Sequence, residues 1–277
     1  MKIQYLGTAA AEGAPALYCH CEKCEQFRKA GGKNLRARSQ ALIDDKLLID
    51  FNADTYSNFT RFGLDLSAVK NIVITHSHHD HFVPFDLMER KTYKAENMVE
   101  PTVTLYGNRA VLDKYARFID EEPDDEKNVI LKELKPFESF EVEGYKITPL
   151  RAQHMPSEDA CILLIEKEGK TLLYGNDTGL LPKESTAYMV KNKVKLDFIG
   201  FDCTFGSVPN VPYKGHMGLD TNVKQYEEFK KKGLLKEDTK VLLTHFSHWY
   251  IPLHGEMAKL GAEYGFDVAY DGICYEV

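Results

Sequence analysis

THSHHDHF, residues Thr75 to Phe82, is the stretch of this chain that most strongly constrains its fold and chemistry. It directly follows the apolar run Ile72 to Ile74, which is typical of a buried strand. Alternate side chains of an extended segment point to the same side, so the first two histidines can face one ion. If the backbone then turns into a helix, the next acid and histidine face a second ion. Imidazole and carboxylate groups bind Zn²⁺, Mn²⁺ or Fe²⁺. The candidate ligands are His76, His78, Asp80 and His81.

The composition limits the classes of protein to which this chain can belong. The chain has 277 residues, 43% of them hydrophobic, which is enough for a large core. We expect one domain over residues 1–277, since no repeat or Pro/Gly/Ser-rich linker divides it. The formal net charge of -7 argues against nucleic acid or an anionic membrane as partner. With no signal segment or membrane-length apolar run, the sequence predicts a cytoplasmic protein that acts on a small molecule.

A second cluster of metal-binding residue types is CHCEKC, with thiols at Cys19, Cys21 and Cys24. Close cysteine spacing without a secretory signal favours a metal site over disulfides, and zinc is the usual ion. Three thiolates leave one position of a tetrahedral site open, so a fourth ligand is expected from elsewhere in the chain. Reduced structural thiols or a redox pair are the alternatives. Single cysteines in apolar runs, which we expect in the core, are Cys161, Cys203 and Cys274.

Further candidate residues stand at the ends of apolar, strand-like runs. Loops at one edge of an open α/β sheet converge on a crevice, so such residues can meet in space. Each alone is weak evidence, because a polar residue at a strand end also suits a simple turn. Asp50 ends one such run, and we expect backbone N–H groups to hold its carboxylate. The others are His154, Asp177, Asp202 and His245.

Helical periodicity occurs between the strand-like runs, at residues 84–95, 108–119 and 221–232, and a last helix is expected to begin at His254. The alternation of strands and helices indicates an α/β fold.

Four basic residues lie between Lys29 and Arg38, a stretch too short for a nucleic-acid-binding stripe. Arg36 or Arg38 could contact a substrate phosphate, and a solvated surface is the alternative interpretation.

The complete pattern of candidate ligands resembles the metallo-β-lactamase superfamily of binuclear hydrolases. The resemblance runs from Lys2 to the C-terminus and rests on the motif HxHxDH followed by single His, Asp and His residues after successive strands. It implies an αβ/βα sandwich, in which two facing mixed β-sheets carry helices on their outer sides. It further implies one ion held by His76, His78 and His154, a second held by Asp80, His81 and His245, and a bridging carboxylate from Asp177.

Within the superfamily, CHCEKC combined with a histidine three residues after the last active-site ligand resembles the phosphodiesterase branch of carbon–phosphorus lyase metabolism. This resemblance implies a structural zinc site and supplies the missing fourth ligand. The implied cofactors are two divalent ions (Zn, Mn or Fe) in the active site and one structural Zn. The ligands of the structural Zn would be Cys19, Cys21, Cys24 and His248.

The resemblance therefore implies a metal-dependent phosphodiesterase acting on small or cyclic phosphodiesters. Two adjacent cations lower the pKa of a shared water, so a bridging hydroxide is the expected nucleophile. His216 is the candidate to protonate the leaving group or to bind a phosphate oxygen, with Asp202 orienting it, unless it is a surface histidine. Asp80 completes the expected catalytic residues. The alternatives are a lactonase, a thioester hydrolase or a non-catalytic metal-binding relative, and a homodimer is left open.

Overall fold

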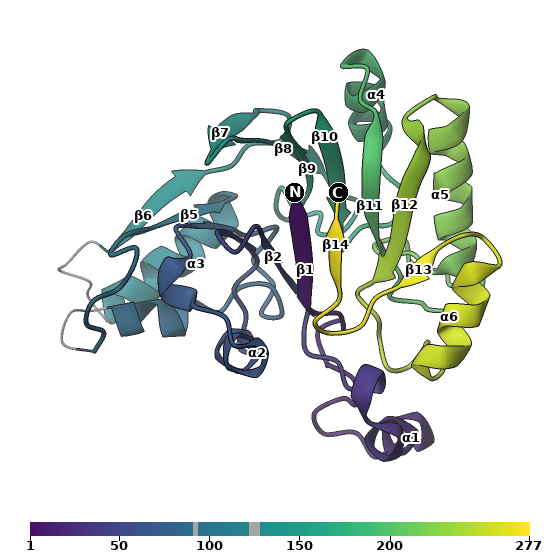
Figure 1. Ribbon diagram of the computed structural model, residues 1–277, viewed down its shortest axis with the longest axis horizontal. Helices are drawn as coiled ribbons and strands as arrows, with labels where there is room; N and C mark the ends of the chain where they lie inside the picture. Colours follow the sequence, from purple (N-terminus) through teal and green to yellow (C-terminus); the bar gives the residue numbers. More distant parts are fainter. Residues whose placement is uncertain (91–93, 122–127) are drawn as a thin grey trace.

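The computed structural model describes residues 1–90, 94–121 and 128–277, and in this part of the chain the strands form two mixed sheets of seven strands each (Figure 1). The first sheet contains, in spatial order, β14 (Cys274–Glu276), β1 (Lys2–Gly7), β2 (Gln40–Ile43), β3 (Leu47–Ile49), β4 (Asn71–Val73), β5 (Val103–Gly107) and β6 (Val129–Glu133). The second contains β13 (Asp267–Val268), β12 (Leu235–Thr244), β11 (Leu196–Asp202), β10 (Lys170–Gly175), β9 (Cys161–Lys167), β8 (Tyr145–Arg151) and β7 (Phe140–Val142).

Each sheet combines a parallel part with an antiparallel part. Strands β3 to β6 are parallel to one another, and so are β10 to β13, whereas β3 pairs antiparallel with β2 and β10 pairs antiparallel with β9. Strand β1 pairs antiparallel with β14, which places the two termini side by side (Figure 1). The αβ/βα sandwich expected from the resemblance is confirmed by this arrangement.

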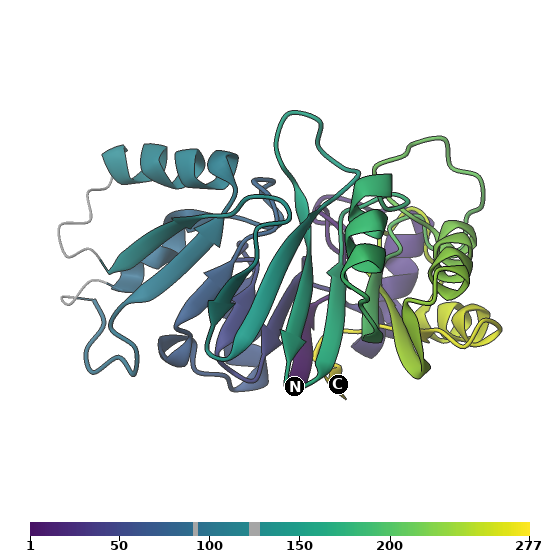
Figure 2. The same ribbon diagram turned by 90° about the horizontal axis from the view of Figure 1, so that it is seen from above.

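Helices lie outside the two sheets. Figure 1 shows α5 and α6 flanking the second sheet and α1 at the lower edge of the molecule, while Figure 2 shows α3 and α6 at opposite ends. The expected helix at residues 84–95 is instead a short 3-10 helix, Pro84–Arg90, and residues 91–93 lie outside the described part. The helices are α1 (Glu22–Ala30), α2 (Thr55–Phe62), α3 (Arg109–Glu121), α4 (Lys183–Lys191), α5 (Leu219–Lys231) and α6 (His254–Ala262).

Successive side chains of a strand serve two different cores. Ala41 and Ile43 of β2 pack between the sheets, whereas Leu42 packs in a second core that includes residues of α2 and α3. This division follows from the two-residue period of a strand. Tyr5 of β1 reaches across to β11, where a Cβ added to Gly200 would lie 2.2 Å from the tyrosine hydroxyl. Glycine therefore permits the close approach of the sheets at this position.

Two of the three isolated cysteines lie in the core as expected. Cys161 and Cys203 are buried, but Cys274 is exposed because β14 is the edge strand of its sheet. The expectation of a core position was therefore wrong for Cys274. None of the helices in the described ranges has the length and hydrophobicity needed to cross a bilayer.

Candidate metal centre and active site

The ends of several strands converge on one cavity of about 420 Å³. The segment 75–82 follows β4, and single ligand candidates follow β8, β10 and β12. Strands β8, β10 and β12 run in the same direction, so the loops after their carboxyl ends lie at the same edge of the sheet, and residues far apart in the sequence meet here. The candidates that line the cavity are His78, Asp80, His154, Asp177, His216 and His245.

One group of histidine nitrogens forms the first candidate site. The Nε2 atom of His76 lies 3.0 Å from Nδ1 of His78, and Nε2 of His154 lies 3.2 Å from the same atom. Nitrogens that share a tetrahedral zinc ion at the usual bond length are separated by about 3.4 Å. The three imidazoles therefore have the spacing of ligands to one ion.

A second group contains two histidines and two carboxylates. His81 Nε2 lies 3.2 Å from Asp80 Oδ2 and 2.7 Å from Asp177 Oδ2. His245 Nε2 lies 2.9 Å from the same oxygen of Asp177. The other oxygen, Asp177 Oδ1, lies 3.6 Å from Nε2 of His154 in the first group. Asp177 thus offers one oxygen to each group, as a bridging carboxylate must.

Three atoms of the second group lack hydrogen-bond partners among the described residues, which bears on whether a cation fits between them. His81 Nε2, His245 Nε2 and Asp177 Oδ2 are buried, close together and not aligned as hydrogen bonds with any described residue. Burial favours the neutral form of Asp177, but His245 and His81 hold its pKa well below the ordinary value. Buried polar atoms without partners are costly, and a divalent cation between them would satisfy all three. The donor set therefore fits divalent metal.

The remaining ring nitrogens are held by neighbouring groups. His81 Nδ1 lies 2.6 Å from Asp50 Oδ2, and the other oxygen of Asp50 accepts hydrogen bonds from the backbone and hydroxyl of Thr75, both at 2.9 Å. The Thr204 hydroxyl lies 2.9 Å from Nδ1 of His245. Such contacts fix which nitrogen faces a metal. Asp50 is accordingly a supporting residue, as its position at a strand end suggested.

Three of these residues have a backbone conformation that is uncommon outside glycine. Asp50, Asp177 and His245 have φ angles of 66°, 52° and 60°. Each follows directly, or by two residues, the end of a strand. Left-handed conformations of this kind cost about 1–3 kcal/mol and cluster at functional sites. The strain is consistent with a backbone that is forced to aim side chains into the cavity.

His216 lines the cavity, and Asp202 is buried behind it. His216 Nδ1 is 2.7 Å from Asp202 Oδ2, and the other oxygen of Asp202 accepts hydrogen bonds from the backbone N–H groups of Thr204 and Met217. Burial lowers the pKa of His216, but the charge of Asp202 outweighs it and the pKa is raised. The Nε2 atom of His216 is left to contact a ligand.

The four candidates for the structural zinc also come together. The thiols of the CHCEKC segment and a nitrogen of His248 all lie within 4.8 Å of one another, and the cysteines are free. Nδ1 of His248 lies 3.1 Å from Glu12 Oε1, whereas its Nε2 is buried with no hydrogen-bond partner in the described part of the chain. Three sulfurs and one nitrogen are a common tetrahedral zinc set, so the residues fit this ion.

The basic segment 29–38 has a structural role. Arg36 is only 4% exposed and donates hydrogen bonds to Thr8 Oγ1 and to the carbonyl of Ala269. Arg38 pairs with Asp54 at 2.9 Å. Neither arginine lines the metal cavity. The solvated-surface interpretation is therefore wrong for Arg36, because its guanidinium is taken up by internal partners.

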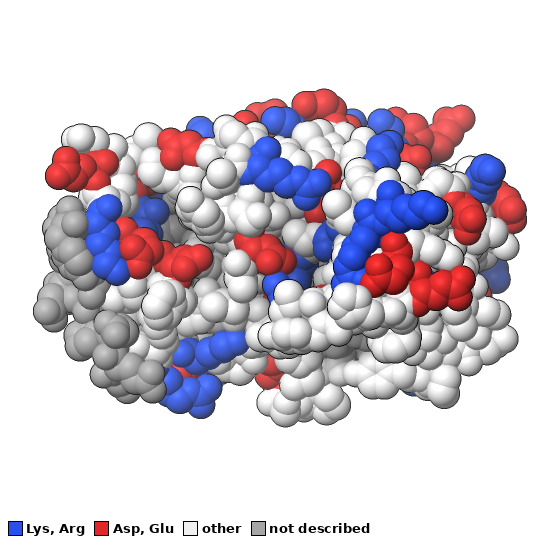
Figure 3. Space-filling model, turned by 90° about the horizontal axis from the view of Figure 1, so that it is seen from below, with Lys and Arg blue, Asp and Glu red and all other residues white. Residues whose placement is uncertain are grey.

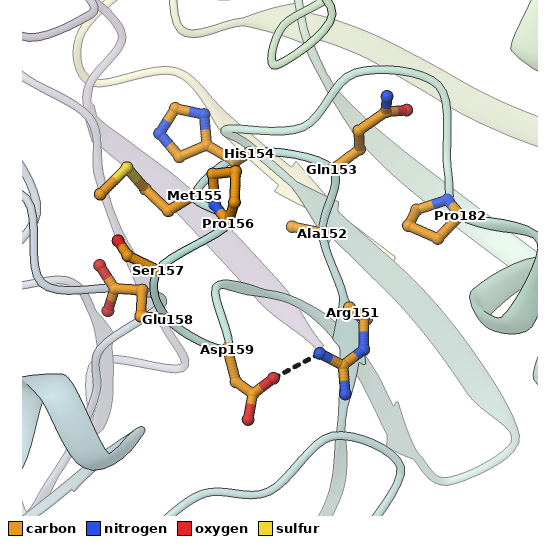
Figure 4. A pocket seen from close by; sticks show the side chains of 10 residues that line it. All are labelled: Arg151, Ala152, Gln153, His154, Met155, Pro156, Ser157, Glu158, Asp159 and Pro182. Carbon is orange, nitrogen blue, oxygen red and sulfur yellow. Dashed lines mark hydrogen bonds and ion pairs between the residues drawn. The ribbon is translucent and has the colours of Figure 1, made fainter.

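A larger pocket, about 560 Å³, adjoins the centre (Figure 4). It is formed by residues 151–159 and Pro182, and His154 is its one residue in common with the metal cavity. Figure 4 shows the Arg151–Asp159 ion pair at the end away from His154. No second group of convergent ligands lies among its described lining residues. Size alone therefore does not identify the active site.

Two residues that the sequence did not indicate hold the 75–82 segment in place. Glu158 accepts hydrogen bonds from the backbone N–H and the hydroxyl of Ser77, at 3.1 and 2.8 Å. Lys114 Nζ donates to the carbonyls of Ser77 and Phe82, at 2.8 and 2.6 Å. A lysine on an amphipathic helix and a glutamate in a loop have no distinctive sequence pattern, so only the fold reveals them.

We expect Lys114→Met to weaken metal binding without unfolding the protein. The substitution keeps the aliphatic part of the side chain but releases the two carbonyls that fix both ends of the ligand segment. Loss of a supporting contact of this kind lowers metal affinity by about 10- to 100-fold. Competition titration with a chelator measures it, and Arg117→Met, at an exposed position of the same helix, is the control. Equal affinities in the two variants would contradict the assignment.

Comparisons with known proteins place this geometry in context. A family model described as a β-lactamase superfamily domain matches residues 47–246, well over half of the chain. An octanoyltransferase of Porphyromonas gingivalis is 26% identical over 163 residues, which are 56% of this chain and 31% of that protein. The chain thus matches less than a third of the length of this relative.

Solved structures share the fold over the whole chain. A diphosphatase from the PhnP family has a TM-score of 0.75 at 22% identity, with 100% of this chain and 96% of that chain covered. Zn²⁺-bound PqqB from Methylobacterium extorquens has a TM-score of 0.76 at 18% identity, with 100% of both chains covered. At these identities the likeness establishes the fold alone.

Proposed function

Because the chain belongs to the β-lactamase superfamily, we propose that it is a metal-dependent hydrolase whose substrates are small or cyclic phosphodiesters. The observation that carries the proposal is the arrangement of seven side chains in two adjacent groups that share the carboxylate of Asp177. Two divalent cations held close together are the usual means of hydrolysing phosphate esters.

The ligand assignment is part of this proposal. Zn²⁺, Mn²⁺ and Fe²⁺ all accept such ligands, so the donor set leaves the identity of the ions open. Bound there, two cations would supply Lewis acidity and lower the pKa of water. One ion would be held by His76, His78 and His154, the other by Asp80, His81 and His245, with Asp177 shared. Structural zinc would be held by Cys19, Cys21, Cys24 and His248.

The residues of the chain itself orient the substrate and move a proton. Asp202 holds Nδ1 of His216 at 2.7 Å, so Nε2 is the atom that can give a proton to the departing alkoxide. Tyr213 lines the same cavity and packs closely on Gly215, where an added Cβ would lie 2.7 Å from its ring. This packing gives the loop before His216 a defined shape beside the substrate.

We expect His216→Gln to show whether His216 donates a proton to the leaving group or binds a phosphate oxygen. An alkoxide leaving group needs a proton, whereas a nitrophenolate leaves without one. If His216 is the acid, the substitution should lower the turnover rate of a 2′,3′-cyclic nucleotide by about 10²-fold or more. It should change the turnover rate of bis(p-nitrophenyl) phosphate little. Steady-state kinetics of both substrates measure this. Equal losses would instead show that the imidazole binds a phosphate oxygen.

Purified, Mn²⁺-loaded protein tested against bis(p-nitrophenyl) phosphate, a 2′,3′-cyclic nucleotide and a lactone distinguishes the candidate functions. The fold similarity to a PhnP-family diphosphatase and the presence of His216 beside the ligands support diester cleavage. We expect turnover of the diesters. Lactone turnover without diester turnover would overturn the proposal.

A further inference from the structure

Glu12 is an acidic residue of the metal cavity that does not belong to either ligand group. It lies in the loop between β1 and α1, and it lines the cavity together with Ser247. Its side chain is 30% exposed. The carboxylate therefore has access to a ligand in the cavity.

Two hydrogen bonds hold this carboxylate in a defined orientation. Glu12 Oε1 accepts from the hydroxyl of Ser247 and lies 3.1 Å from Nδ1 of His248. Both partners follow His245 closely in the sequence, and Ser247 is 5% exposed while His248 is 3% exposed. No hydrogen bond from the described residues reaches Oε2 of Glu12. One oxygen is thus fixed by protein and the other is free to accept a hydrogen bond from a ligand.

The same contacts connect the cavity to the structural zinc site. His248 would use Nε2 as a zinc ligand and donate its Nδ1–H to Glu12, the usual arrangement of a carboxylate behind a metal-bound histidine. The zinc ligand His248 thereby fixes the side chain of Glu12, which lines the cavity. His248 lies three positions after His245, which belongs to the second ligand group.

The charges around the cavity restrict its substrates. Glu12, Asp80 and Asp177 contribute carboxylates, and none of the described residues that line the cavity is Lys or Arg. A neighbouring pocket that shares Glu12 is lined by three arginines, each of which has a protein partner. Arg36 donates to internal groups, Arg38 is paired with Asp54, and Arg61 is paired with Asp271. Figure 3 views the molecule from below, and on this face basic and acidic side chains are interspersed rather than gathered in a continuous basic patch. A ligand with several negative charges would lack counter-charges here apart from metal ions.

We propose that Glu12 is a specificity-determining residue, which selects phosphodiesters with a single negative charge and a hydrogen-bond donor such as an ammonium or hydroxyl group near the diester. The inference rests on the phosphodiesterase proposal and names the substrate class of that site. A charge-assisted hydrogen bond to Oε2 stabilises such a substrate, whereas like charge repels a substrate that carries a further phosphate.

The test compares two chromogenic substrates, the p-nitrophenyl phosphodiesters of ethanolamine and of ethanol, which differ by the ammonium group. We expect wild-type protein to prefer the ethanolamine ester by about 10-fold in kcat/KM, the effect of one charge-assisted hydrogen bond. Glu12→Gln should remove most of this preference through KM, because the amide oxygen can still accept from His248 but the charge is lost.

A control variant, elemental analysis and Tm distinguish a specificity role of Glu12 from a structural one. Glu22→Gln, on the exposed surface of α1, should retain the preference. Elemental analysis and Tm should show that Glu12→Gln keeps its zinc and stability. If wild-type protein cleaves both esters equally, or if Glu12→Gln slows both equally, the specificity role is wrong while the phosphodiesterase proposal stands. Cleavage of neither ester would count against the phosphodiesterase proposal itself.

Discussion

Replacing His78 by alanine is expected to abolish diester hydrolysis and to leave the fold intact. His78 Nδ1 lies 3.0 Å from Nε2 of His76 and 3.2 Å from Nε2 of His154, so its removal opens the first candidate site. The side chain is only partly buried and belongs to neither apolar core. Loss of about 4 kcal/mol of Lewis-acid stabilisation corresponds to a roughly 10³-fold lower kcat/KM.

The prediction is tested by measuring kcat/KM with bis(p-nitrophenyl) phosphate and the metal content of the same preparation by elemental analysis. His79→Ala is the matched control, because His79 is exposed and lines the same cavity but belongs to neither ligand group. It should change kcat/KM by no more than a few-fold. A His78→Ala protein that keeps its full metal content and activity would show that the first group is not a metal site.

The sequence was most informative where chemistry and strand position coincide. His154, Asp177 and His245 are single residues, yet each follows a buried strand. Because β8, β10 and β12 run in the same direction, the positions after them lie at one edge of the sheet. All three lie around the 75–82 segment as expected. The structural role of Asp50 was predicted from the same kind of position.

The sequence was least informative where a residue acts through the tertiary fold. Glu12, Lys114 and Glu158 bind groups from 32 to 236 residues away, and none lies in a motif. Strand β6 was not predicted because it is an edge strand with mostly exposed side chains, and so lacks the apolar alternation that marks a strand. A single domain, a cytoplasmic location and a homodimer stay predictions.

Cys21→Ser is expected mainly to lower stability. A serine hydroxyl is a poor zinc ligand, so the CHCEKC segment and His248 would lose the ion that joins them. A ligand present at a thousandfold excess over its Kd stabilises the folded state by about 4 kcal/mol, and for a chain of this size that corresponds to a fall in Tm of roughly 10 °C. Differential scanning calorimetry of zinc-loaded protein measures it.

Metal analysis distinguishes this role from a catalytic one. Cys21→Ser should lose zinc from the structural site and keep the active-site ions, because no sulfur belongs to either group around Asp177. Cys161→Ser would perturb the core, so Cys274→Ser, at an exposed thiol, is the appropriate control and should leave Tm unchanged. Since His248 orients Glu12, the loss of zinc should also raise KM more than it lowers kcat. Loss of active-site metal with an unchanged Tm would contradict the division between the two sites.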